Sequence, residues 1–189
     1  MSRSKRSLLL LAIPMIVGCA SVASLPKETG AFRVLNVPFF PGVSQRCGPA
    51  SLASVMNYWK VPVTVDEVAG DVFNADLHGS LPFDLAHFPG KLGLEATEYF
   101  GSPEDLRDHL RRGHPLITFL NLGNSLFPAG HFVVVIGYTE DGNWLIAHSG
   151  GERGKRIPYE RFVAAWAKMD YWTLLILPKG GATGEAFAR

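Results

Sequence analysis

The helix and strand signals of this chain follow one another in a definite order, and that order limits the folds it can adopt. Helical signals crowd the first half and strand signals the second half, with one short helix between strands. This order is typical of α+β proteins, in which helices pack on an antiparallel sheet. The expected helices cover residues 47–59, 64–73, 84–92, 102–112 and 159–169. The expected strands cover residues 115–122, 131–138, 143–149 and 171–177, after an extended segment at residues 33–40.

Size and charge indicate one domain that binds its ligand in a pocket. A chain of 189 residues with 47% apolar residues is large enough for one globular domain with its own core. Its 18 basic and 17 acidic side chains give a formal net charge of +1, which argues against the basic face of a nucleic-acid binder. The glycine-rich basic stretch at residues 150–156 lacks the strand and helix that flank a phosphate loop, and we interpret it as a turn.

The N-terminal residues have the layout of an export signal. A basic start (Arg3, Lys5 and Arg6) precedes an apolar run at residues 8–17, which is shorter than the ~20 residues of a spanning helix. The segment Ile16-Val17-Gly18-Cys19 resembles the bacterial lipobox, whose Cys becomes the lipid-modified first residue of the mature protein. An ordinary signal peptide cut near Ala20 or Ala23 is the alternative.

These signals divide the chain into four segments. We expect a lipoprotein-type signal peptide at residues 1–18, a tether of small and polar residues at 19–33, one domain at 34–178 and a flexible tail at 179–189. The expected protein is exported and lipid-anchored through Cys19 to a bacterial cell membrane, on its periplasmic or extracytoplasmic side.

Cys47 is then the one thiol left in the domain, and it stands where a helix is expected to begin. Gly48 and Pro49 mark the helix start, and Leu52 and Val55 follow at helical spacing. An exported protein with a single thiol cannot form an internal disulfide. The unpaired N–H groups at a helix N-terminus favour a thiolate, which would lower the pKa of Cys47 and make it reactive. A buried cysteine that serves as a small apolar residue is the alternative.

A reactive thiol needs a histidine partner, and six histidines are available. His131 opens the most apolar expected strand, where an imidazole is badly placed unless it faces a cleft. His148 ends the next strand, so a hairpin around Asp141-Gly142 would bring the two rings to one edge of the sheet. The other histidines lie in polar surroundings and are expected in solvent: His78, His87, His109 and His114.

Two segments together resemble the papain-like, bacteriocin-processing (double-glycine leader) peptidases and their broader relatives. NVPFFPGVSQRCGPASLASVMNYW is similar to the segment that carries the family's nucleophile, and the later GHFVVVIGY is similar to its histidine segment. The middle region GSLPFDLAHFPGKLGLEA also resembles the family, so the likeness spans roughly residues 34–178. It implies a papain-like α+β fold, with the nucleophile helix and other N-terminal helices packed on a C-terminal antiparallel sheet.

The resemblance also implies roles. Cys47 would be the nucleophile and His131 the general base and acid of a cysteine peptidase acting on a peptide or protein substrate, with no cofactor and no metal. The family places an acid or amide after the second strand to orient the histidine, and here His148 stands at that position as the candidate orienter. Relatives carry an oxyanion-hole Gln five or six residues before the Cys. Those positions are Gly42 and Pro41 here, so Gln45 is the candidate oxyanion donor.

Three functions follow from these residues. The first is a thiol hydrolase that cuts peptide bonds or transfers an acyl group through Cys47 and His131. The second is a catalytically weak or inactive peptide-binding module of the same fold, suggested by Gly42 and His148. The third is a zinc site made by Cys47, His131 and His148, although their spacing matches no local metal motif.

Overall fold

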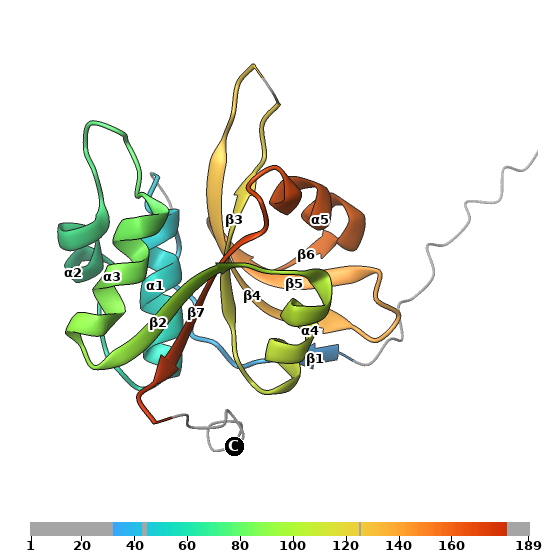
Figure 1. Ribbon diagram of the computed structural model, residues 1–189, viewed down its shortest axis with the longest axis horizontal. Coiled ribbons are helices and arrows are strands. Elements are labelled where there is room, and N and C mark those ends of the chain that lie inside the picture. The colour runs from blue at the N-terminus through green and yellow to red at the C-terminus, as the bar shows by residue number, and fades with distance from the viewer. Residues whose placement is uncertain (1–31, 43–44, 125, 181–189) are drawn as a thin grey trace, which may run out of the picture.

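The structure is a computed structural model that describes residues 32–42, 45–124 and 126–180 (Figure 1). The signal peptide, Cys19, most of the tether and nearly all of the expected tail lie outside the described residues. Within the described part, a sheet stands between two groups of helices, with α1, α2 and α3 on one side and α4 and α5 on the other (Figure 1). No helix in this part is long and apolar enough to cross a membrane.

Helices α1, α2 and α4 begin where the sequence places a start signal, whereas α3 begins at Pro82, two residues before its expected start. Helix α1 runs over Cys47–Tyr58 and starts at the Cys-Gly-Pro triplet. At the start of α2, Thr64 and Glu67 form a capping box, in which each side chain accepts a hydrogen bond from the other residue's backbone N–H. Ser102 caps α4 in a similar way by accepting from the N–H of Asp105. The remaining helix bounds are α2 Val65–Val72, α3 Pro82–Lys91, α4 Pro103–Arg111 and α5 Tyr159–Ala167.

The strands of the described residues form one antiparallel, seven-stranded sheet. Its order is β2-β7-β3-β4-β5-β6, and β1 pairs with the far end of β4. The strand bounds are β1 Phe32–Val34, β2 Leu94–Phe100, β3 Leu116–Asn121, β4 Gly130–Thr139, β5 Trp144–Ser149, β6 Glu152–Pro158 and β7 Trp172–Pro178. The α+β, papain-like architecture expected from the sequence is confirmed.

The central strands are buried on both faces, which explains why they read as continuous apolar runs. Phe132 and Val134 of β4 face α1, α2 and α3, whereas Val133 and Val135 face α4 and α5. Helix α1 is buried along nearly its whole length, so its first residue is held in a fixed place against β4. Every residue of the two apolar clusters lies between residues 35 and 177. These two clusters form the core of the described residues.

Two strands and the place of two helices differ from the sequence expectation. Strand β6 replaces the turn expected at residues 150–156, and β2 falls on a segment for which no strand is expected. Both are edge strands with mostly exposed side chains, so neither shows the apolar alternation by which strands are recognised. The sequence also predicts one helical layer, whereas α4 and α5 form a second layer on the other face of the sheet.

Candidate active site

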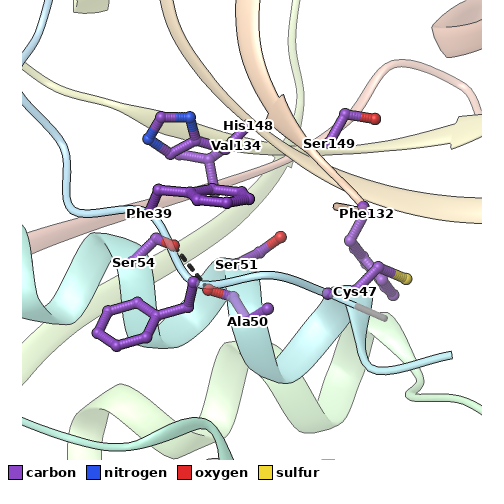
Figure 2. Close-up of a pocket in the computed structure, with 12 residues that line it drawn as sticks. Phe39, Cys47, Ala50, Ser51, Ser54, Phe132, Val134, His148 and Ser149 are labelled. Carbon is purple, nitrogen blue, oxygen red and sulfur yellow. Dashed lines mark hydrogen bonds between the residues drawn. The ribbon is translucent and has the colours of Figure 1, made fainter. Parts of the chain in front are cut away.

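The thiol of Cys47 lies at the first turn of α1, partly buried against β4 (Figure 2). Burial raises the pKa of the Cys47 thiol above its ordinary value, and this effect outweighs the backbone groups of Phe132, Gly48 and Cys47, which lower it. The helix N-terminus therefore acts in the direction that the sequence predicts but does not dominate. At neutral pH the resting residue is a thiol, and it needs a base to become a nucleophile.

The segment before the helix passes close to the Cys47 backbone at Gly42. A Cβ atom on Gly42 would lie 2.9 Å from Cys47 Cα and 3.3 Å from its backbone N, closer than side-chain atoms pack. The Gly42 N–H donates to the carbonyl of Gly150 at 2.8 Å, which ties this segment to the turn between β5 and β6. Gly42 therefore leaves no room for the Gln that the family resemblance leads us to expect near this position.

His131 stands at the start of β4, where its ring is oriented by a serine. His131 Nε2 and Ser149 Oγ are 3.0 Å apart, and Ser149 ends the neighbouring strand β5. Burial, with a smaller contribution from the positive charge of Lys155, lowers the pKa of His131. The imidazole is therefore neutral at physiological pH. Since Nε2 is engaged by Ser149, Nδ1 is the ring nitrogen left to take a proton from a thiol.

His148 does not contact His131. Its Nε2 donates to the Val37 carbonyl at 3.0 Å, and its Nδ1 accepts from the Gly154 N–H at 3.1 Å. Figure 2 shows its ring beside Phe39, away from the sulfur of Cys47. The pocket drawn there has a volume of about 10 Å³, and Phe39, Cys47 and His148 are among the residues that line it. The geometry gives the orienting position to Ser149, and His148 instead fixes the segment around Val37 against β6.

Cys47 and His131 line the same cleft. The cleft has a volume of about 460 Å³ and is bounded on one side by residues 77–81 and on the other by β3 and β4. No hydrogen bond joins the thiol to the imidazole within the described residues, as is common in peptidases without a bound substrate. Gln45 also lines this cleft. Its side chain is exposed, and its backbone has a left-handed φ of 66°. It makes no hydrogen bond there to a described residue.

The other four histidines do not join this pair. His78 is exposed on the cleft wall, and His87 is exposed on α3. His109 and His114 differ from the sequence expectation, because their Nδ1 atoms are 3.2 Å apart and both rings are at least half-buried beside α4.

A metal site finds no support in the geometry. No group of three or more His, Cys, Asp or Glu side chains could hold a metal ion in the part of the chain that the structure describes. Both ring nitrogens of His148 already have protein partners, so it is not available as a ligand beside Cys47 and His131.

The family model for the Peptidase_C39 like family matches residues 34–173. The chain belongs to this family. Three solved structures are similar to it. A double glycine motif protease from an AMS/PCAT transporter, in complex with its leader peptide, is 27% identical with a TM-score of 0.63, over 77% of this chain and 94% of that chain.

The other two similar structures show the fold alone. The peptidase domain of Streptococcus ComA, a bifunctional ABC transporter of a quorum-sensing pathway, is 24% identical with a TM-score of 0.60, over 78% of this chain and 99% of that chain. A C39-like peptidase from Bacillus anthracis is 19% identical with a TM-score of 0.62, over 78% of this chain and 98% of that chain. A comparison with curated proteins finds no match.

Proposed function

We propose that this C39-like chain is a cysteine peptidase in which Cys47 is the nucleophile and His131 the general base and acid. The observation that carries the proposal is the shared cleft, in which a thiol at a helix start and a serine-held imidazole lie on facing elements. The family's fold and the leader-peptide complex of one relative support a peptide as the substrate.

The pKa directions fit a mechanism that starts from a neutral pair. His131 Nδ1 takes the proton of the Cys47 thiol while Sγ attacks the peptide carbonyl. The S–C bond forms, the C–N bond breaks, and the proton passes from His131 to the departing amine. Water then gives a proton to His131 and its hydroxyl to the acyl carbon, which frees the thiol. A different acceptor at this last step would make the enzyme an acyl transferase.

The oxyanion of this reaction would be held mainly by backbone groups. The Cys47 N–H at the start of α1 is one donor, and Gln45 is the candidate side-chain donor from the cleft rim. Because Gly42 excludes a larger side chain, the donor that relatives supply from this segment is replaced or missing here. Loss of one such donor costs about 100- to 1000-fold in rate, so a slow enzyme is expected.

The proposal includes export and attachment to the membrane. The basic start, the apolar run at residues 8–17 and the lipobox-like Cys19 support an exported lipoprotein on the extracytoplasmic side of a bacterial membrane. Cys19 would serve as the lipid-bearing residue and Cys47 as the catalytic one.

The direct test is cleavage of a peptide mixture, with products identified by mass spectrometry. The native protein should produce cut peptides, whereas Cys47→Ser and His131→Ala should not. His87→Ala is the matched control, since this exposed residue lies outside the cleft, and it should cleave like the native protein. Equal cleavage by Cys47→Ser would remove the thiol from the mechanism.

A second candidate function is a peptide-binding module without turnover. It is favoured by the raised pKa of Cys47 and by Gly42 at the segment where relatives carry their Gln. It predicts peptides that bind with the same affinity to the native protein and to Cys47→Ser, with no product from either. Product that depends on the thiol would exclude it.

A further inference from the structure

A second cleft lies away from the thiol, between α5, β6 and the end of β3. Its volume is about 480 Å³. Four cationic side chains line this cleft. Lys155 and Arg156 come from β6, Arg161 from α5 and Lys168 from the C-cap of α5. No acidic side chain is among its lining residues, and its floor is apolar through Leu120, Ile157 and Phe162. The cleft therefore combines an apolar base with a cationic rim.

The charge of this rim is only partly neutralised. Lys155 pairs with Glu152 at 2.5 Å, and Lys168 donates to the Gly123 carbonyl at 2.9 Å, which accepts the bond without cancelling the charge. Arg161 is exposed and has no ion pair among the described residues. Glu152 and Glu160 are the acids of β6 and α5, and neither lines the cleft. In a chain with a net charge of +1, this is a local positive excess.

An apolar tip projects beside this cleft. The connection between β3 and β4 exposes Leu122 by 59%, Leu126 by 80% and Phe127 by 75%. Figure 1 shows the connection extending beyond the body of the sheet, next to α5. Leu122 belongs to both features, because it also lines the cationic cleft. We refer to these three side chains as the apolar tip.

The apolar tip is held in place by the chain itself. Asn121 Oδ1 accepts from the N–H groups of Gly123 and Ala129, and Asn124 Oδ1 accepts from those of Leu126 and Phe127. The bond from Lys168 to the Gly123 carbonyl joins this connection to the end of α5. Hydrogen bonds among the described residues therefore link the tip to the cationic cleft.

We propose that the apolar tip and the cationic cleft form a surface that docks on membranes rich in anionic phospholipid. Headgroup phosphates would bind among Lys155, Arg156, Arg161 and Lys168, and the tip would enter the boundary with the acyl chains. An acidic peptide would account for the cations but not for bulky apolar side chains at the projecting end. Because the thiol cleft is lined by β3 and β4, the two strands that the tip connects, docking would hold it close to the membrane surface.

The test uses co-sedimentation with vesicles of phosphatidylcholine, with and without phosphatidylglycerol. The protein is the chain from residue 20 onward, which lacks Cys19 and keeps every residue of the two apolar clusters. Binding should require phosphatidylglycerol and weaken with added salt. Arg161→Ala with Lys168→Gln should lower partitioning by roughly 5-fold for each cation removed, and the Gln keeps an N–H donor for Gly123.

Two further variants separate the membrane from other anionic partners. Lys91→Ala with Lys179→Ala removes the same charge from exposed positions outside the cleft and should leave partitioning unchanged. Leu126→Ser with Phe127→Ser should also release the protein from vesicles. Three results would overturn the proposal: no binding to anionic vesicles, an equal loss in the Lys91 and Lys179 variant, or full binding without the apolar tip. The last result would show that charge alone binds the protein to the vesicles. None of them bears on peptide cleavage.

Discussion

His131 and Ser149 are joined by a hydrogen bond between Nε2 and Oγ, with the two atoms 3.0 Å apart. Through this bond, the end of β5 fixes the orientation of the imidazole at the start of β4. A hydroxyl carries no charge, so it orients the ring without stabilising an imidazolium. In the proposed mechanism, His131 therefore acts as a neutral base.

Ser149→Ala should slow turnover without weakening substrate binding. Because Ser149 acts through His131, kcat should fall roughly 3- to 10-fold, the value of one hydrogen bond, while KM changes little. Ser149→Thr keeps the hydroxyl and should restore most of the rate. Steady-state cleavage kinetics of the three proteins check this, and a Thr variant as slow as Ala would contradict the positioning role.

Gly42→Ala should destabilise the protein. The added Cβ would press on the backbone of Cys47, and such overpacking costs about 1–3 kcal/mol in the free energy of unfolding. Gly90→Ala is the matched control, since a Cβ there meets nothing within 4 Å. Gly90 lies in α3, so this change should raise the free energy of unfolding by about 0.5–1 kcal/mol. Urea unfolding measures both variants. A neutral Gly42→Ala would mean that the segment before α1 lies further from the thiol.

Acid should destabilise the fold through His148. Burial lowers the pKa of His148, so the unfolded chain, with an ordinary histidine pKa of about 6.5, takes up the proton first. The contribution of His148 to stability is therefore fully present above about pH 6.5 and is lost as the pH falls below it. Protonating Nδ1 would also break the bond from the Gly154 N–H.

The measurement is the free energy of unfolding in urea at about pH 8 and about pH 5. His148→Gln should show a smaller loss between these conditions than the native protein. The variant should still lose some stability in acid, since burial also lowers the pKa values of His109, His114 and His131. His87→Gln, at an exposed position, is the control and should leave the slope unchanged. An unchanged slope in His148→Gln would contradict the prediction.

Cys19→Ala should release the protein from the membrane pellet in an expressing bacterium. In the proposal the lipobox-like segment supplies the anchor, so a protein without acyl chains would keep only the contact proposed for the apolar tip. Fractionation at high salt checks this, because salt weakens the remaining electrostatic contact. Retention of Cys19→Ala in the pellet under these conditions would contradict the lipid anchor.

Among the strands, the sequence predicts those that are buried and misses the two exposed edge strands. The central strands β3, β4, β5 and β7 are recognisable because burial demands apolar runs, and α1 because Pro49 and its apolar spacing mark a helix. The edge strands β2 and β6 need no apolar run, because most of their side chains are exposed to solvent. Their place in the sheet depends on their neighbours, which a local pattern does not contain.

The partner of His131 could not be read from the sequence because of one β-bulge. Residues 137 and 138 pair with 146 and 145, but beyond the bulge Val134 pairs with His148 and Val133 with Ser149. Without this shift, His148 would pair with Val135 and share the face of His131. A one-residue slip exchanges the two faces of a strand, so the bulge in β4 puts His131 on the face of Ser149, while His148 stays on the face toward α1.

The pairing of Cys47 with His131 is tested most directly by the rate of alkylation of Cys47 against pH, with and without His131→Ala. The account predicts that the native thiol reacts at neutral pH with the help of His131. In His131→Ala it should react only as the buried thiol itself ionises, above the value of about 8.5 of a free thiol. Coincident profiles for the two proteins, or a native thiol that reacts only after unfolding, would contradict the Cys47 and His131 pair.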